Sequence, residues 1–193
     1  MRAVEEAGLS GEEQTAPPGI WPTFSDPRFI TFLRCWAERR RGLMQPRSSI
    51  DPATIKSCLP HVWLIQHRRQ EGDFICTLAG EKVNEAWGQS VIGKPLTTFM
   101  PSDYAESCVS QYREIMQRPA LLVSRRRINP LKRSEKAAER LVAPLSDDEG
   151  RPYGVFGMTL YYFDPVTQAR DVVDVTGETL FYNCADLPNG LPG

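Results

Sequence analysis

The order of the predicted secondary-structure elements indicates an α+β protein, in which helices cover one face of an antiparallel sheet. Two short β-rich segments come first, at 61–67 and 73–79, and a polar turn joins them into a hairpin. A longer helical segment at 101–118 separates this hairpin from the remaining strands. Three further β-rich segments follow, at 120–128, 137–145 and 153–163.

A leading helix is predicted over residues 27–41. Asp26 is a good N-cap, Pro27 suits the first helical position, and Gly42 can end the helix. Because its apolar stripe is wide, we expect the helix to contact its own sheet and also the same helix of a second chain. The alternative left open is that it covers only its own core. The predicted dimer contact consists of Phe29, Phe32, Leu33 and Trp36.

The segments between the leading helix and the long helix are predicted to be short helices and loops. A second helix is expected to begin at Asp51, a good N-cap followed by proline, and to end at Pro60. Residues 80–100 are interrupted by glycine and proline, which indicates short helical turns joined by loops. In the last strand, Gly154 and Gly157 are expected to allow a close backbone approach or a bulge.

The length of 193 residues suits one domain with extensions. Residues 1–24 are predicted to be a disordered N-terminal tail, because they are rich in Glu, Gly and Pro and have little to bury. The domain itself is expected at 25–163. Residues 164–193 are expected to be a partly disordered C-terminal extension, with 172–175 and 180–182 as segments that could dock.

The net charge of −1 gives no global attraction to nucleic acid or to an anionic membrane. No apolar run reaches the roughly 18 residues that span a bilayer, and the N-terminus has no apolar signal segment. We therefore expect a cytoplasmic protein with no membrane span and no nucleic-acid partner. The five scattered cysteines, without a Cys-x-x-Cys pair, are expected to be buried thiols.

Candidate catalytic and metal-binding residues are few. His61 and His67 would lie about 20 Å apart on one strand, and a zinc site needs three or four ligands. Cys58 lies three residues before His61, but its alignment with apolar neighbours favours a core thiol over a nucleophile. We expect no metal site and no catalytic residue.

Basic residues are concentrated at 125–140, which contains seven positively charged and two negatively charged side chains. A hairpin with this charge could contact phosphates, but no recognition helix or aromatic-rich basic face accompanies it. A solvated sheet edge is the simpler interpretation, and an acidic signalling protein is a more plausible partner than DNA. The predicted partner-binding residues are Arg125, Arg126 and Arg127.

Several stretches carry a resemblance to a known family. They are Phe32–Trp36 with Arg39–Gly42, the run PRSSIDPATIKSCLP from Pro46 to Pro60, Leu78-Ala79-Gly80 with Gly88 and Gly93, and VAPLSDDEGRPYGVFG from Val142 to Gly157. Together with the element order, they resemble the PAS-domain family, and within it a bacterial subfamily of short, mostly stand-alone PAS proteins.

The resemblance implies a PAS fold: a five-stranded antiparallel sheet in the order 2-1-5-4-3, with short helices on one face and a leading N-terminal helix. It also implies a pocket between the sheet and the short helices, which PAS domains fill with a cofactor, a metabolite or their own side chains. These alternatives stay open. The candidates for the lining are Trp63, Ile65, Phe74, Leu78, Trp87, Phe99, Tyr104, Tyr112 and Met158.

Two cofactors of PAS domains leave sequence signatures that this chain lacks. Flavin-binding light sensors carry a cysteine in an Asn-Cys-Arg-Phe-Leu-Gln motif, whereas the comparable region here, Val83–Gly88, has none. Haem-binding members typically take a histidine from the long helix, and 101–118 contains none. We expect neither haem nor flavin, and an unidentified small molecule remains a candidate ligand.

The resemblance and the lack of a convergent acid–base set predict a non-enzymatic sensory or regulatory module of bacterial signal transduction. It would bind a small ligand or a partner protein, and it is expected to form a homodimer. The alternative is a small α+β enzyme, a hydrolase or isomerase, that uses the same pocket.

Overall fold

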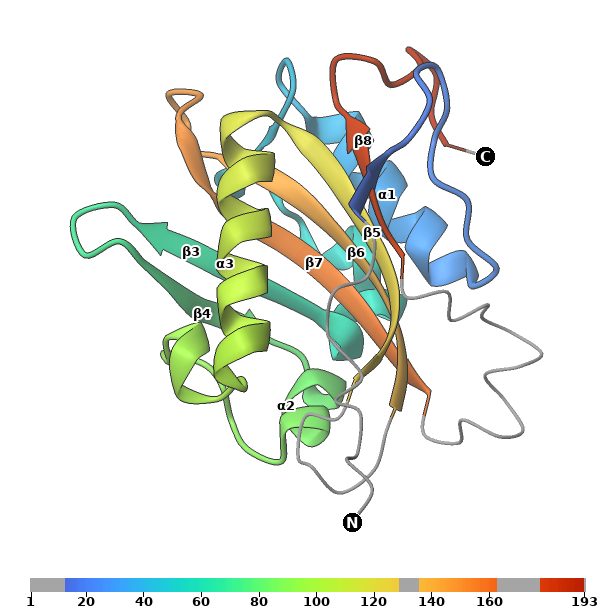
Figure 1. Ribbon diagram of the computed structural model, residues 1–193. Helices are drawn as coiled ribbons and strands as arrows, with labels where there is room; N and C mark the ends of the chain where they lie inside the picture. The colour runs from blue at the N-terminus through green and yellow to red at the C-terminus, as the bar shows by residue number, and fades with distance from the viewer. Residues whose placement is uncertain (1–12, 129–135, 163–177, 193) are drawn as a thin grey trace.

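The computed structural model describes residues 13–128, 136–162 and 178–192, and they build one mixed sheet between two layers of helices (Figure 1). The sheet has eight strands in the described residues, in the order β1-β8-β5-β6-β7-β3-β4, and β2 pairs with β6 beside this path. The strands are β1 Glu13–Thr15, β2 Gln45–Pro46, β3 Val62–Arg68, β4 Asp73–Ala79, β5 Ala120–Ile128, β6 Lys136–Ser146, β7 Pro152–Tyr162 and β8 Thr179–Asn183.

The five central strands have the predicted arrangement. In chain order β3, β4, β5, β6 and β7 are the five expected strands, and their spatial order β4-β3-β7-β6-β5 is 2-1-5-4-3. All four pairings within this set are antiparallel. The prediction of a sheet limited to five antiparallel strands is wrong, because β8 pairs with β5, and the two short strands β1 and β2 pair in parallel with β8 and β6.

The additional strands come from the predicted tails. β8 pairs with β5 from Ala120 to Ser124, and this pairing covers a row of backbone groups that would otherwise form an open edge. β1 then adds to β8, and Ala16 N donates to Phe181 O at 2.8 Å. The expectation of a disordered tail is therefore corrected for residues 13–24, which pack on the domain. Residues 1–12 and 163–177 lie outside the described residues.

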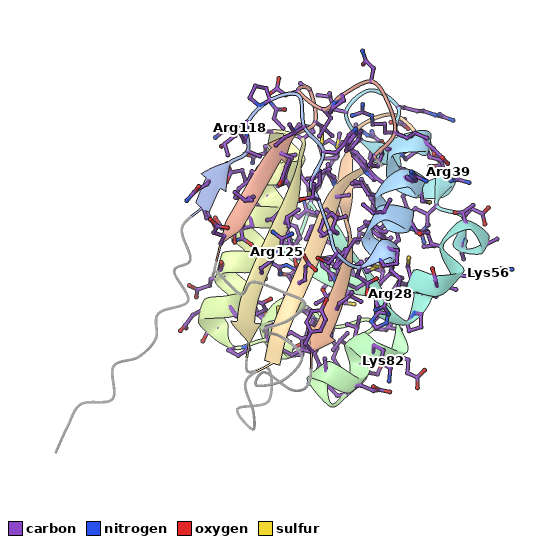
Figure 2. The ribbon with its side chains drawn as sticks, turned by 90° about the vertical axis from the view of Figure 1, so that its right-hand side faces the viewer. Arg28, Arg39, Lys56, Lys82, Arg118 and Arg125 are labelled. Atoms are coloured by element: carbon purple, nitrogen blue, oxygen red, sulfur yellow. The ribbon has the colours of Figure 1, made fainter. Side chains whose placement is uncertain are left out.

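Helices lie on both faces of the sheet, not on one as predicted. Figure 2 shows the sheet from its side, with α3 on one side and α1 and η2 on the other. The four consecutive residues Val62–Ile65 of β3 are all buried, as expected for a strand covered on both faces. None of the helices in the described part of the chain is long and apolar enough to cross a membrane. The helices are α1 Pro27–Arg39, η1 Arg47–Ser49, η2 Pro52–His61, α2 Glu81–Trp87, η3 Leu96–Thr98 and α3 Ser102–Gln117.

The apolar stripe of α1 belongs to the chain's own core. Phe29, Phe32, Leu33 and Trp36 are each 0% exposed. The ring of Phe32 packs 4.6 Å from that of Phe156 on β7, and Trp36 Nε1 donates to Pro144 O at 3.0 Å. Because the whole stripe is buried against the sheet, none of the four side chains has exposed surface that a second chain could contact. The predicted dimer contact through them is corrected, and a second chain would have to use another surface.

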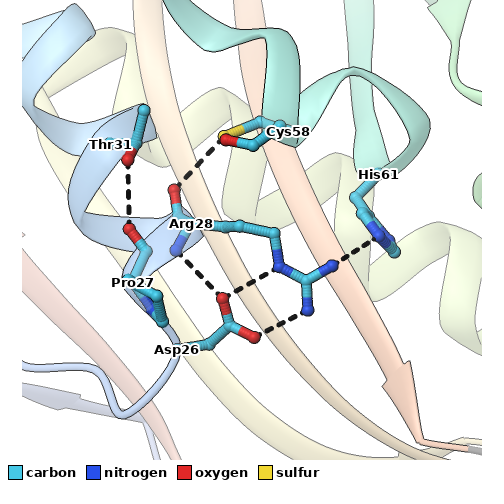
Figure 3. A network of polar contacts seen from close by, with 7 residues as sticks. Asp26, Pro27, Arg28, Thr31, Cys58 and His61 are labelled. Atoms are coloured by element: carbon cyan, nitrogen blue, oxygen red, sulfur yellow. Dashed lines mark hydrogen bonds and ion pairs between the residues drawn. The ribbon is translucent and has the colours of Figure 1, made fainter.

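A polar network fixes the start of α1 against η2 (Figure 3). The Asp26 carboxylate accepts from Arg28 N at 2.9 Å, as expected of the N-cap, and forms a 2.6 Å ion pair with Arg28 Nη2. The hydrogen bonds from Arg28 lower the pKa of Asp26. Arg28 Nη1 donates to His61 Nε2 at 2.8 Å, and burial together with this cation lowers the pKa of His61. His61 is therefore neutral, with its proton on Nδ1.

Candidate functional site

A cavity lies between the sheet and the layer of α2, η3 and α3. Its unfilled volume is about 30 Å³, room for about two water molecules. Strands β3, β4, β6 and β7 form its floor, and side chains of α2, α3 and the segment around η3 form its walls and roof. The lining consists of Trp63, Ile65, Cys76, Val83, Trp87, Val91, Phe99, Met100, Tyr104, Tyr112, Arg140, Thr159 and Tyr161.

Six of the nine predicted pocket residues line this cavity, and a seventh lies beside it. Phe74 is on the same face, with its ring 6.1 Å from that of Tyr112 and stacked on His67. The six that line the cavity are Trp63, Ile65, Trp87, Phe99, Tyr104 and Tyr112. Most of the predicted residues therefore lie at this cavity, but all three lining residues from β6 and β7, Arg140, Thr159 and Tyr161, were missed.

Two predicted pocket residues, Leu78 and Met158, lie on the opposite face and pack with α1. Successive side chains of β7 point to opposite faces of the sheet, so Met158 lies on the α1 side, whereas its neighbour Thr159 faces the cavity. Leu78 pairs with Leu64, whereas Cys76 pairs with Ile65, because the register shifts between them. This irregularity inserts one residue into β4 and turns Leu78 away from the cavity.

Six of the thirteen lining residues are aromatic, and the ring of one of them lies directly on a glycine. Trp63 packs with its ring 5.8 Å from that of Tyr112, and Trp63 Nε1 donates to Thr159 Oγ1 at 2.9 Å. A Cβ on Gly157 would lie 2.2 Å from Cζ2 of Trp63. The missing side chain at Gly157 is what lets the Trp63 ring lie on the sheet, whereas the close backbone approach expected at the two glycines is confirmed at Gly154, which lies against the backbone of Ile65.

The cavity contains a buried arginine, which the sequence analysis assigned to the basic segment 125–140. Arg140 on β6 is 5% exposed. Its Nη1 donates to the hydroxyls of Tyr104 and Tyr112 at 3.2 and 3.4 Å and to Cys108 Sγ at 3.4 Å. Its Nη2 donates to Gln111 Oε1 at 3.3 Å. The Nε atom has no partner among the described residues.

Arg140 has no anionic side chain in contact with its guanidinium in the part of the chain that the structure describes. An arginine stays protonated at any physiological pH, and no carboxylate among the described residues forms an ion pair with it. Burial raises the pKa of Tyr112 far above its usual value, so this hydroxyl is neutral. The contact with an acid is indirect, because Gln111 Nε2 donates to Glu13 Oε1 at 2.8 Å on β1.

Cys76 supplies the thiol of the cavity. All five cysteines are buried, as predicted. Burial raises the pKa of Cys76 to about 11, and its Sγ donates to Leu78 O at 3.3 Å. Cys76 is therefore a neutral thiol at pH 7, which gives the cavity no ready nucleophile.

We expect the free energy of unfolding to decrease as the pH rises from about 9 to about 11. Cys76 loses its proton near pH 9 in the unfolded chain and at about 11 in the folded chain, so its contribution is complete below pH 9 and is lost across this window. One pKa unit corresponds to about 1.4 kcal/mol, so the loss due to Cys76 is about 2–3 kcal/mol at pH 11. Urea denaturation between pH 8 and 11 measures it.

The matched variant is Cys76→Ala, whose unfolding free energy should decline less steeply over the same range. Some decline will remain, because burial also raises the pKa of Cys184, to about 12. Parallel pH curves for the wild type and Cys76→Ala would contradict the assignment.

Arg125, a predicted partner-binding residue, is held within the chain. Its Nε forms a 2.7 Å ion pair with Glu139 Oε1, and its Nη2 donates to Thr23 O at 2.9 Å. Glu139 is 2% exposed, and burial raises its pKa although Arg125 opposes the shift. β8 covers β5 from Ala120 to Ser124, and Arg125 N still donates to Glu178 O at 3.2 Å, so β5 is not an open edge as far as Arg125. The interpretation of Arg125 as a free surface cation is corrected, and the side chains of Arg126 and Arg127 lie outside the described residues.

We expect Arg125→Met to lower the free energy of unfolding by roughly 2–3 kcal/mol, because it leaves the Glu139 carboxylate buried without a cation. The double variant Arg125→Met/Glu139→Met should recover most of this loss, since it removes both charges. Urea denaturation of the three proteins measures the effect. A single variant as stable as the wild type would show that the ion pair contributes nothing.

A protein-family model described as a PAS domain matches residues 25–160 of this chain. The match covers well over half of the sequence, and the chain belongs to the PAS-domain family. This agrees with the order of the five central strands and with a cavity on the α3 side of the sheet. The family resemblance and the coarse fold expected from the sequence are confirmed.

Solved structures give more distant similarities. The PAS domain of BvgS from Bordetella pertussis is 12% identical, with a TM-score of 0.48 over 62% of this chain and 88% of that chain. VqmA from Vibrio cholerae, in a complex with ligand and DNA, is 15% identical, with a TM-score of 0.47 over 56% of this chain and 49% of its own. A LOV protein from Rhodobacter sphaeroides is 10% identical, with a TM-score of 0.44 over 62% and 72%.

This chain therefore matches about half the length of that VqmA chain. A search of curated proteins found no match.

Proposed function

We propose that this protein is a sensory PAS module that binds a small molecule in the cavity between the sheet and α2, η3 and α3. The observation that supports this most is Arg140, a buried cation in a mostly apolar cavity, whose Nε donor has no partner among the described residues. A core filled only by its own side chains gains nothing from an uncompensated buried charge. Ligand pockets, in contrast, combine apolar walls with a few polar groups that orient the ligand.

The segment around η3 is the part of the cavity wall whose position would change when a ligand binds. Phe99 and Met100 line the cavity from this segment. The segment is attached to β4 by two hydrogen bonds, from Cys76 N to Lys94 O at 3.0 Å and from Gly93 N to Cys76 O at 2.7 Å. A ligand larger than the present cavity must displace side chains of the lining, and displacement of Phe99 or Met100 would move the surface of this segment. That movement is the signal we propose.

The lining favours binding over catalysis. Burial raises the pKa values of Cys76, Tyr112 and Tyr161, so none of these three groups is a base at neutral pH. A hydrolase or isomerase needs a positioned acid and base whose pKa values lie near the working pH. The enzyme alternative has no support from these side chains.

The freshly purified protein is expected to be colourless. The missing cysteine and histidine signatures argue against flavin and haem, and a cavity of about 30 Å³ is far below the roughly 300 Å³ that a drug-sized ligand occupies. An absorbance spectrum tests this directly. A haem Soret band or a flavin band near stoichiometry would contradict it.

The function is tested with a library of small metabolites and two variants of one cavity residue. Ligands that bind the folded state raise the melting temperature. Cys76→Met fills the cavity, and Cys76→Ala enlarges it, while both remove the thiol. Compounds that stabilise the wild type should still stabilise Cys76→Ala and should fail with Cys76→Met. Equal stabilisation of Cys76→Met would place the binding site elsewhere and overturn the proposal.

A further inference from the structure

We propose that the cavity recognises the carboxylate of a small organic acid and that Arg140 is the residue that binds it. This inference rests on the proposed function, because it names the chemical class of the molecule that the cavity would accept. It is carried by the geometry around the guanidinium, the absence of a counter-charge among the described residues and the apolar character of the rest of the lining.

The guanidinium of Arg140 is held only loosely by its present neighbours. Its four contacts measure 3.2–3.4 Å, whereas a charge-assisted hydrogen bond from arginine to a carboxylate is typically about 2.7–2.9 Å long. The Nε–H points to no acceptor among the described residues. A planar carboxylate can accept two parallel hydrogen bonds from the arginine fork, so it would replace long contacts with short ones.

The charge of the site also calls for an anion. The groups that contact Arg140 are two hydroxyls, a thiol and an amide, and the link to a carboxylate is indirect, through Gln111 to Glu13 on β1. A single negative charge would neutralise the buried cation and remove much of its desolvation cost. The hydroxyl of Tyr112, 3.4 Å from Nη1, is a neutral group placed to contact the same carboxylate.

The apolar character of the remaining lining favours a carboxylate over a phosphate. Apart from Arg140 and a few hydroxyl and thiol groups, it consists of aromatic and aliphatic side chains such as Trp63, Trp87 and Phe99. A phosphate carries more charge and needs more donors than one arginine supplies, whereas a monocarboxylic acid has one charge and an apolar body. The cavity of about 30 Å³ favours a short acid, and an aromatic acid would enter by displacing Phe99 or Met100.

The experiment compares acids with their uncharged amides. Isothermal titration calorimetry at constant ionic strength uses acetate, propionate and benzoate, then acetamide, propionamide and benzamide, with inorganic phosphate as a further anion. The proteins are the wild type, Arg140→Met and Arg118→Met. Arg118 is an exposed cation at the end of α3 (Figure 2), so its variant controls for the loss of one positive charge.

We expect at least one carboxylate to bind the wild type ten times more tightly than its amide, with phosphate not binding. Arg140→Met should weaken that binding at least tenfold, and Arg118→Met should leave it unchanged. Arg140→Met removes the desolvation cost of the buried charge and keeps a side chain of similar length, so we expect this variant to fold. If Arg140→Met fails to fold, Arg140→Gln, which keeps a hydrogen-bonding head without charge, carries the same expectation.

Three results would overturn the inference. Amides that bind as tightly as the acids would show a ligand cavity without charge recognition, and the proposed function would then stand without this inference. Equal carboxylate binding by wild type and an uncharged Arg140 variant would exclude Arg140 as the contact. No binding of any carboxylate would also reject it, and the metabolite library with the Cys76 variants then decides the proposed function separately.

Discussion

Trp36→Ala is expected to lower the free energy of unfolding by about 3–5 kcal/mol. The Trp36 ring is 0% exposed between α1 and the sheet, so its removal leaves a large cavity. The substitution also leaves the buried Pro144 carbonyl without the indole N–H that it accepts from at 3.0 Å, which adds the cost of an unpaired polar group. Urea denaturation at pH 7 measures the change.

Trp21→Ala is the matched control, because Trp21 is partly exposed and its indole donates to Gly190 O at the surface. We expect it to cost about 1 kcal/mol or less, in line with the modest net value of a single hydrogen bond. Equal losses for the two tryptophans, or an unchanged Trp36→Ala protein, would show that α1 does not depend on the sheet for its packing.

Gly157→Ala is expected to cost about 2–3 kcal/mol, as an overpacked site beneath a rigid ring. The new methyl group would lie 2.2 Å from Cζ2 of Trp63, so the ring must move into the cavity. That movement breaks the 2.9 Å hydrogen bond from Trp63 to Thr159. The stability loss should be accompanied by weaker binding of any molecule that uses the cavity.

A double-mutant cycle with Trp63→Leu separates this contact from other effects. In the Trp63→Leu background the cost of Gly157→Ala should fall below about 1 kcal/mol, because no ring lies over the glycine. Gly190→Ala is the control for adding a methyl group, since nothing lies within 4 Å of its Cβ position. The same cost for Gly157→Ala in both backgrounds would reject the proposed contact.

The elements that could be predicted from the sequence are those with strong local signals. The N-cap aspartates Asp26 and Asp51 accept the expected backbone N–H groups. The long helix and β5 lie within a residue of the predicted bounds, because Pro101 precedes the helix and Pro119 separates it from the strand. β1 could not be predicted, because it is three residues long and its partner β8 is more than 160 residues away.

The lining of the cavity could be predicted where side chains alternate regularly between the two faces of a strand. Residues 63 and 65 alternate onto the cavity face as expected, but the register shift in β4 reverses Leu78. Met158 could not be assigned from the pattern, because both faces of β7 are buried and apolar. Arg140 was missed because arginines are almost never fully buried. The alternation of side chains along β6 could have placed Arg140 at the cavity, since Arg140 shares a face with Val142.

The four tryptophans of the chain provide the most direct test of the ligand cavity. Trp63 and Trp87 line it, whereas Trp21 and Trp36 pack on the α1 side of the sheet. In a proton–nitrogen NMR spectrum each indole gives its own signal, so titration with benzoate, propionate and acetate and with their amides reports both faces at once. We expect saturable shifts of the Trp63 and Trp87 signals, with Trp21 and Trp36 unmoved. No shift with any of the six compounds would reject the carboxylate inference, and shifts confined to Trp21 and Trp36 would contradict the assignment of this cavity as the ligand site.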